Sequence, residues 1–256
     1  MYRLKKSLGQ HFLRDENISK KIVSALRERP FCRLLEVGPG GGALTKYLMQ
    51  LEGVEFLAVE PDAEKIRHLE DTWPALRGKI HEGSILDMEK PFHGPFTVIG
   101  NFPYNISSQI LFRMLEWKAD LQAVVGMFQK EVALRAAAKE GSKIYGVLSV
   151  LIQAFFTVEY LFEVGESSFT PPPKVRSAVI RLTPVSPPSF RDERAFFQVV
   201  KTAFNQRRKT LRNAVRPLFD AETLRDPLFD RRAEQLTITE FAGLTWRMST
   251  TLLQPT

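Results

Sequence analysis

The sequence predicts an α/β protein: a mostly parallel sheet with helices on both faces, followed by a small C-terminal helical domain. Three observations support this expectation. Short apolar runs alternate with amphipathic helical segments between residues 34 and 138, which is the pattern of βαβ units. The alternation then stops, and two strand-like segments follow each other with no helix between them. Beyond a proline-rich linker, Pro184 to Pro188, only helical patterns appear.

The first expected helix runs from Asp15 to Arg29, with acidic residues in its first turn and basic residues in its last, as the helix dipole favours. The alternating part predicts strands at 34–37, 54–59, 79–82, 96–100 and 121–128, and helices at 43–51, 62–72, 107–117 and 131–138. Strands joined by crossover helices are expected to run parallel.

The second half predicts a different arrangement. A helix is expected at 147–155, then strands at 157–164 and 178–182, joined by the loop Phe169-Thr170-Pro171-Pro172-Pro173. Because no helix connects these two strands, we expect them to be antiparallel. Further helices are expected at 193–204, 207–215 and 238–253, with an acidic and basic segment near Arg231. The predicted domains are residues 1–184 and 189–256.

Composition limits the class of protein. A chain of 256 residues with 44% hydrophobic content can bury a full core and still form one small accessory domain. No N-terminal apolar stretch of signal length and no 18-residue apolar run appears, so we expect no membrane association and a cytoplasmic location. The single cysteine, Cys32, excludes an internal disulfide, and beside Phe31 and Leu34 it is expected to be a buried apolar residue. A monomer is the expected assembly state.

The charge is unevenly distributed. The chain carries a net charge of +7, divided as +6 in residues 1–33, −3 in residues 34–186 and +4 in residues 187–256. Basic termini around a slightly acidic body suit a catalytic domain flanked by phosphate-binding surfaces. Basic residues that merely solvate helix faces are the alternative explanation.

A glycine-rich turn predicts a cofactor site. The apolar strand Leu34 to Val37 leads into Gly38-Pro39-Gly40-Gly41-Gly42, and a helical pattern follows. Glycines at such a turn let the backbone approach a ligand and direct N–H groups at it, so Gly38 and Gly40 are candidate contacts. The next strand ends in Glu60, which can accept hydrogen bonds from ribose hydroxyls.

This arrangement serves any adenosine cofactor, and three details favour S-adenosylmethionine over NAD. The turn reads G-x-G-x-G rather than G-x-G-x-x-G, no phosphate-binding Lys-Ser/Thr pair follows it, and a later strand ends in Asn101-Phe102-Pro103-Tyr104. The P-loop pattern is absent. The fold expected is therefore that of a class I S-adenosylmethionine-dependent methyltransferase, which is Rossmann-like.

The tetrapeptide Asn101-Phe102-Pro103-Tyr104 predicts a pocket for a planar amine. The Asn101 amide oxygen and the carbonyl near Phe102 can accept both N–H bonds of adenine N6, and Tyr104 can stack on the base. A strand that simply ends in a proline turn is the alternative. The four histidines show no metal-ligand spacing with one another or with Cys32, so no metal is expected.

Several segments together resemble the ribosomal RNA adenine dimethylase family, and in particular its small-subunit branch. They are Leu8 to Leu13, Glu36 to Gly42, Asn101 to Ser107, Phe169 to Val175 and Ala203 to Leu211. The resemblance extends from about Leu4 to the end of the chain. It implies N6-dimethylation of two adjacent adenosines near the 3′ end of small-subunit (16S) rRNA during subunit biogenesis, with S-adenosylmethionine as donor.

The resemblance also assigns roles to residues. His11, Leu13 and Gly38 correspond to cofactor contacts, Glu60 to the ribose acceptor and Asn101 to the acceptor for the target base. Ser84 stands where the family usually has Asp, against the adenine amino group of the cofactor, and loses the charge assistance; Asp87 nearby is a candidate substitute. Phe102 replaces the usual Leu or Ile, with little expected effect.

Two further roles are expected. The resemblance places the Phe169 loop beside the active site, where the ring could stack on the target adenine opposite Tyr104; an anchor to the core is the alternative. Basic residues expected to bind rRNA phosphates lie near both ends of the chain: Lys5, Lys6, Arg14, Arg207, Arg208, Lys209, Arg212 and Arg216.

Other functions remain open at this point. A large-subunit rRNA adenine methylase would share the fold and cofactor, although the Phe169 and Phe204 segments favour the small-subunit branch. A DNA adenine methylase is disfavoured because that class typically has Asp-Pro-Pro-Tyr in place of Asn-Phe-Pro-Tyr. A non-catalytic RNA-binding assembly factor is the alternative from a different class.

Overall fold

The computed structural model describes residues 11–27 and 30–249. Contacts between residues divide the chain into two compact units. The first contains the sheet and comprises residues up to Ala133 together with Phe156–Pro184; the second comprises Leu134–Phe155 and the chain from Val185 onward.

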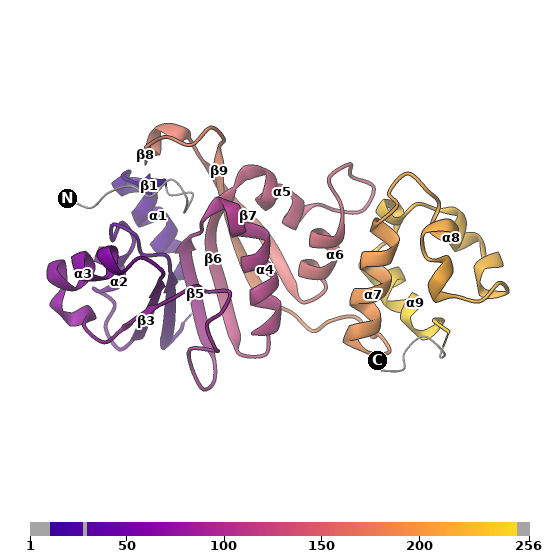
Figure 1. Ribbon diagram of the computed structural model, residues 1–256, viewed down its shortest axis with the longest axis horizontal. Coiled ribbons are helices and arrows are strands. Elements are labelled where there is room, and N and C mark those ends of the chain that lie inside the picture. Colours follow the sequence, from indigo (N-terminus) through magenta and orange to yellow (C-terminus); the bar gives the residue numbers. More distant parts are fainter. Residues whose placement is uncertain (1–10, 28–29, 250–256) are drawn as a thin grey trace. The chain divides into compact units, whose positions relative to one another are not determined.

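The first unit is built on a seven-stranded sheet (Figure 1), in the order β4-β3-β2-β5-β6-β9-β7. Its strands are β2 (Arg33–Val37), β3 (Glu55–Glu60), β4 (Ile80–Glu82), β5 (Phe96–Asn101), β6 (Leu121–Gln129), β7 (Phe156–Val164) and β9 (Ser177–Pro184). Strands β2 to β6 are parallel, whereas β9 pairs antiparallel with both β6 and β7. The predicted mostly parallel sheet with an antiparallel end is confirmed.

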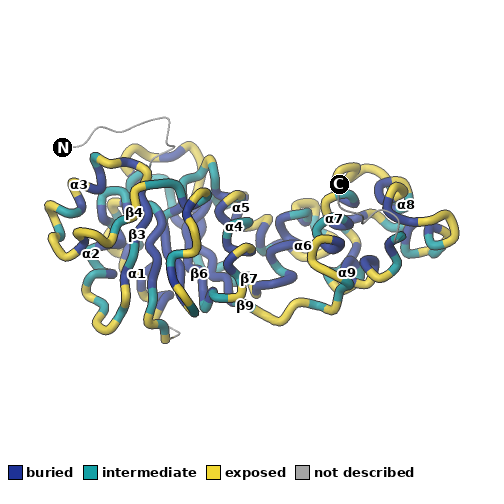
Figure 2. Tube along the Cα trace, turned by 60° about the horizontal axis from the view of Figure 1, so that its bottom comes forward, coloured by how far each residue is buried: buried dark blue, intermediate teal, exposed yellow. Residues whose placement is uncertain are grey.

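Helices cover the sheet because its strands are apolar on both faces. Their bounds are α1 (Glu16–Leu26), α2 (Thr45–Leu48), α3 (Ala63–Thr72) and α4 (Ser107–Glu116). Helix α5 (Lys130–Ala137) begins in the first unit and ends in the second. Ile99 of β5 lies in one core cluster with Ile22 and Leu26 of α1. Val98, its neighbour in the strand, points to the opposite face, where α4 lies (Figure 1). Figure 2 shows the central strands as buried.

The second unit is helical. It contains α6 (Val147–Gln153), α7 (Glu193–Phe204), α8 (Leu211–Ala214) and α9 (Ile238–Trp246), with short 3-10 turns between residues 216 and 235. The Phe155 ring lies 6.0 Å from Phe190 and 6.5 Å from Phe196, measured between centroids. The Gln153 amide also donates to the carbonyls of Ala136 and Ala138. The Phe155 contacts, together with the Gly141 N–H that donates to the Glu234 carbonyl at 2.7 Å, explain why residues 134–155, which the predicted boundary assigned to the sheet domain, group with the C-terminal unit.

Several predicted elements differ in the structure. The helix predicted at 207–215 is only α8, because Thr210 has an extended backbone (φ −63°, ψ 156°) and residues 205–209 form a turn. The helix predicted at 238–253 ends at Trp246, and residues 250–253 lie outside the described part of the chain. Cys32 is exposed rather than buried; it precedes β2, and its carbonyl accepts the Glu55 N–H.

A second, two-stranded sheet was not predicted. Strand β1 (Phe12–Leu13) pairs antiparallel with β8 (Phe169–Thr170). Two-residue strands carry no periodic pattern, and their pairing joins segments that are far apart in sequence. Within residues 11–27 and 30–249, no helix is long and apolar enough to cross a membrane.

Candidate active site

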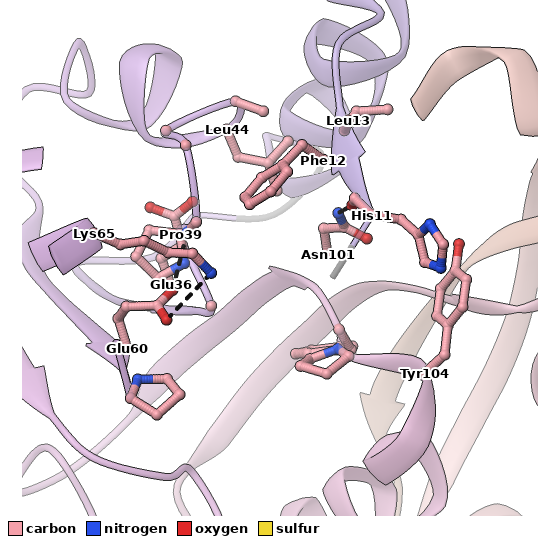
Figure 3. A pocket seen from close by; sticks show the side chains of 18 of the residues that line it. His11, Phe12, Leu13, Glu36, Pro39, Leu44, Glu60, Lys65, Asn101 and Tyr104 are labelled. Atoms are coloured by element: carbon pink, nitrogen blue, oxygen red, sulfur yellow. Dashed lines mark hydrogen bonds and ion pairs between the residues drawn. The ribbon is translucent and has the colours of Figure 1, made fainter. Parts of the chain in front are cut away.

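A cavity of about 510 Å³ opens at the carboxyl ends of the parallel strands β2, β3 and β5. Ligands of open α/β sheets bind at this edge. Figure 3 shows its walls, which come from β1, the glycine turn, α3 and the segment after β5. The principal lining residues are His11, Phe12, Leu13, Glu36, Gly38, Gly40, Glu60, Lys65, Trp73, Ser84, Leu86, Asn101, Phe102, Pro103 and Tyr104.

The glycine turn forms one wall of the cavity. Gly38 (φ +67°) and Gly40 (φ +57°) adopt the left-handed conformation that residues with a Cβ rarely take. A Cβ on Gly40 would also lie 3.2 Å from the Phe12 ring. The sequence therefore needs glycine here for both backbone conformation and the close approach of β1.

Glu60, at the end of β3, is held by the backbone. Its Oε2 accepts the Gly40 N–H at 3.1 Å, and its Oε1 accepts the Asp62 N–H at 3.2 Å. The Nζ of Lys65, from α3, lies 3.8 Å from Oε1. Burial raises the pKa of Glu60, while Lys65 and the two N–H donors oppose that shift.

Glu36, at the end of β2, is a second buried carboxyl group on the cavity. Thr45 donates to its Oε2 at 2.8 Å. Burial raises the pKa of Glu36 to about 8, in spite of that bond and with a further contribution from the nearby Glu60. The folded protein therefore carries Glu36 largely protonated at neutral pH.

These residues fit S-adenosylmethionine. Glu60 presents a carboxylate that can accept hydrogen bonds from ribose hydroxyls, and the glycine turn brings the backbone to the cavity wall. Apolar side chains, including Phe12, Trp73 and Leu86, supply surface for an adenine ring. When bound, the cofactor supplies a methyl group activated by its sulfonium.

Ser84 also lines the cavity, as predicted from its place after Gly83. Its hydroxyl oxygen accepts the Leu86 N–H at 3.1 Å, so part of its acceptor capacity is already used. Asp87, considered as a substitute for the missing carboxylate, is exposed and is not among the residues lining the cavity. The structure therefore gives Asp87 no place in the site.

Asn101 lies at the other end of the cavity, where β5 ends. Its Nδ2 donates to the carbonyl of His11 at 3.2 Å. This bond orients the amide, because it uses one of the two Nδ2 hydrogens and leaves Oδ1 available as an acceptor. Asn101 and His11 are therefore brought together by the pairing of the N-terminal segment with the sheet domain.

The Phe102 side chain points into the core and is 1% exposed. Its ring packs 4.7 Å from the Phe128 ring, between centroids. A Cβ on Gly126 would lie 2.1 Å from the Phe102 ring, and one on Gly100 would lie 2.8 Å from it. Two glycines therefore make room for Phe102, which is consistent with the expectation that only its backbone faces the substrate.

Tyr104 stands beside His11 (Figure 3). The two rings stack with centroids 5.5 Å apart and an interplanar angle of 27°. The Tyr104 hydroxyl shares a hydrogen bond with Ser177, and burial raises the pKa of Tyr104. One face of the ring is thus covered by protein, and the hydroxyl does not act as a base near neutral pH.

Phe169 differs from the predicted stacking role. It is 2% exposed, belongs to the core cluster that includes Leu13, and is absent from the cavity lining. Leu13 is its partner in the β1–β8 pairing. Phe169 therefore anchors its loop to the core, the second of the two interpretations, and Leu13 is buried beside it at the cavity wall.

The predicted RNA-binding residues fall into three groups. Lys5 and Lys6 lie outside the described residues. Arg14, Arg207 and Arg212 make hydrogen bonds to backbone carbonyls: Arg14 to Ser167, Arg207 to Lys143 and Tyr145, and Arg212 to Leu224. Arg208 and Lys209 are exposed in the turn before α8, and Arg216 is exposed in the 3-10 helix Arg216–Leu218.

Some site residues escaped the sequence interpretation. Glu36, Phe12, Lys65 and Trp73 line the cavity, but none was singled out by role. Glu36 lies two residues before the first glycine of the turn, and that position was the available signal. Lys65 is one lysine on an amphipathic helix, and its burial could not be inferred from its type. Among the described residues, no three His, Cys, Asp or Glu side chains could together hold a metal ion.

Comparisons with known proteins agree with this geometry. A family model described as "Ribosomal RNA adenine dimethylase" matches residues 1–245. A Cytophaga hutchinsonii protein named "Ribosomal RNA small subunit methyltransferase A" is 48% identical, over 96% of this chain and 98% of its own length. A Bacteroides thetaiotaomicron protein of the same name is 50% identical, over 94% of this chain and 92% of its own length.

Two solved structures share the fold. A dimethyladenosine transferase from Plasmodium falciparum has a TM-score of 0.77 at 24% identity, covering 90% of this chain and 94% of that one. The 23S rRNA methyltransferase ErmE has a TM-score of 0.68 at 24% identity, covering 91% and 99%. The fold is thus the Rossmann-like fold of class I methyltransferases with additional C-terminal helices. With the family match over residues 1–245, we conclude that the chain belongs to the ribosomal RNA adenine dimethylase family.

Proposed function

We propose that this enzyme dimethylates N6 of two adjacent adenosines near the 3′ end of small-subunit rRNA, with S-adenosylmethionine as methyl donor. The observation that carries the proposal is the Asn101 amide, fixed by His11 at the end of a cavity that also contains the glycine turn and Glu60. The name shared by the relatives supports the small subunit as the source of the substrate.

The protein contributes binding and orientation. The Oδ1 of Asn101 and the backbone at Phe102 accept the two N–H bonds of adenine N6, which directs the nitrogen lone pair away from the ring plane. The side of the Tyr104 ring that His11 does not cover is the candidate stacking surface for the extruded base. At the cofactor end, Glu60 accepts hydrogen bonds from the ribose hydroxyls. The cavity wall around it is completed by Gly38, Gly40, Leu13 and Ser84.

In this proposal, residues of the C-terminal unit bind the rRNA backbone. Arg207, Arg208, Lys209 and Arg216 are candidates that lie exposed, and of these Arg207 is bonded to backbone carbonyls. Lys5, Lys6 and Arg14 supply basic charge near the N-terminus. The enzyme is proposed to act as a monomer in the cytoplasm, where ribosomal subunits of bacteria are assembled.

Methyl transfer to isolated particles tests the proposal. Small subunits lacking the modification, large subunits and adenine-containing DNA are each incubated with enzyme and labelled S-adenosylmethionine, and the nucleosides are then separated. Dimethyladenosine only in small-subunit rRNA is expected. Label in the large subunit or in DNA would redirect the substrate assignment, and no label in any substrate would favour a non-catalytic assembly role.

A further inference from the structure

A buried lysine lines the cavity beside Glu60. Lys65, on α3, is 2% exposed, yet its side chain lines the cavity. A lysine is almost never buried without a partner that compensates its charge. Its surroundings therefore indicate what it does.

Lys65 lies between two walls of the cavity (Figure 3). On one side its Nζ is 3.8 Å from Oε1 of Glu60, at the end of β3. On the other side the same atom is 5.1 Å from the centroid of the Phe12 ring, on β1. One ammonium group thus connects the proposed ribose acceptor with the N-terminal strand.

The distance to Glu60 is informative. At 3.8 Å the two groups attract each other electrostatically, but Lys65 does not occupy an acceptor position of the carboxylate with a short hydrogen bond. A carboxylate has about four such positions, and the N–H groups of Gly40 and Asp62 use one on each oxygen. Capacity for ribose hydroxyls therefore remains on a carboxylate whose charge is compensated.

We propose that Lys65 is a positioning residue for the cofactor: it holds Glu60 as a charged acceptor for the ribose hydroxyls and braces Phe12 over the same end of the cavity. This inference rests on the proposed role of Glu60 as ribose acceptor. Burial and the nearby Asp62 carboxylate both raise the pKa of Glu60, and the charge of Lys65 opposes that shift.

The test measures binding of S-adenosylhomocysteine and of its 2′,3′-dideoxy analogue by calorimetry, without turnover. Lys65→Met removes the charge and keeps the stem. We expect it to weaken S-adenosylhomocysteine binding roughly tenfold, with less than about a threefold change for the dideoxy analogue, since that ligand has no hydroxyls for Glu60 to bind. Lys65→Arg should restore much of the affinity for S-adenosylhomocysteine.

Two control variants distinguish a failure of the role inferred for Lys65 from a failure of the ribose-acceptor role proposed for Glu60. Arg67→Met removes a positive charge from the exposed face of the same helix and should change neither affinity. Glu60→Gln should weaken the binding of S-adenosylhomocysteine and leave the affinity for the dideoxy analogue nearly unchanged. If Glu60→Gln has no effect, the ribose-acceptor assignment fails, and the inference fails with it.

Other results overturn the inference alone. Equal weakening of both ligands by Lys65→Met, in a protein in which Glu60→Gln behaves as expected, would show that Lys65 does not act through the ribose contact. No change for either ligand would do the same. Should Lys65→Met fail to fold, Lys65→Gln and Lys65→Arg supply the comparison, and identical selectivity in these two variants would contradict a role for the charge.

Discussion

Asn101 is the residue on which the proposed chemistry depends most directly. Replacing it with Ala removes the proposed N6 acceptor but leaves the glycine turn and Glu60 in place. We expect turnover to fall by about 100-fold or more, while the Kd for S-adenosylhomocysteine stays nearly constant. Single-turnover kinetics and calorimetry measure the two effects. Gln109→Ala, at an exposed position of α4, is the matched control, and a loss of cofactor binding in Asn101→Ala would move this residue to the cofactor site.

Glu36 gives the protein a specific pH dependence. Its pKa is about 8 in the folded protein, above the ordinary value of 4.5, so the folded state binds the proton more tightly than the unfolded state. The stability that the folded protein gains from binding this proton more tightly is therefore full below about pH 4.5. It is lost as the pH rises to about 8.

Glu36→Gln should abolish this slope. An amide keeps the oxygen that accepts from Thr45 and carries no charge to desolvate. Relative to the unsubstituted protein, the variant should gain more than about 1 kcal/mol in the free energy of unfolding at pH 8 and less at pH 5. Denaturant titrations at the two pH values test this, and an equal gain at both would show that Glu36 is not the titrating group.

Individual residues also show where sequence interpretation succeeds. Asn101, Glu60 and the glycine turn were predictable because each follows an apolar strand, and strand ends converge at one edge of a parallel sheet. Phe169 and Asp87 were not, since their placement depends on which way a loop side chain turns. The burial predicted for Cys32 was also wrong. Its apolar neighbours indicated a place in the core, but the strand begins one residue later and Cys32 is exposed.

At the scale of elements, the β1–β8 pairing shapes the cavity. It places His11 against Asn101 and Tyr104, and Leu13 beside Phe169. Strands this short have no periodic signal, so the pairing could only be seen in the structure. The long apolar strands β2, β5 and β6, in contrast, were predicted nearly to the residue.

Phe169 tests the anchoring interpretation of β8. Phe169→Ala should cost about 3–5 kcal/mol of stability by leaving a cavity in the core, whereas Phe169→Leu should cost less than about 1.5 kcal/mol. If the residue only anchors the loop, the Leu variant retains methyl-transfer activity at a temperature where it is folded. A Leu variant that is stable but inactive would support stacking on the base instead.

The turn before α8 contains three basic residues, for which two different roles are expected. Arg207 donates to the carbonyls of Lys143 and Tyr145 at 2.8 and 3.0 Å, so Arg207→Met should lower stability by about 1–3 kcal/mol. Arg208 and Lys209 are exposed, and replacing both with Ala should leave stability nearly unchanged. The double variant should instead weaken rRNA binding and reduce the slope of log K against log salt by roughly 1 to 2.

Thermal unfolding and filter binding at several salt concentrations distinguish the two groups. A large loss of stability in the Arg208→Ala, Lys209→Ala variant would assign these side chains to the fold. An unchanged salt slope in the same variant would remove them from the rRNA-binding surface.

At the scale of the whole molecule, the division of labour follows the two units. The sheet unit contains every described residue that lines the cavity, and the C-terminal unit contributes exposed basic residues. The sequence predicted both parts, yet it assigned residues 134–155 to the sheet. Helix α6 has an apolar pattern that fits either unit, and the packing of Phe155 against Phe190 and Phe196 places it in the C-terminal one.

Dimethylation of two adjacent adenosines of small-subunit rRNA is the activity proposed for this enzyme. The most direct measurement is mass spectrometry of nuclease fragments from the 3′ end of that rRNA, after unmodified small subunits have been incubated with enzyme and S-adenosylmethionine. The account predicts two neighbouring N6,N6-dimethyladenosines in one fragment and none with Asn101→Ala. Methylation elsewhere, or no methylation by the unsubstituted protein, would contradict it.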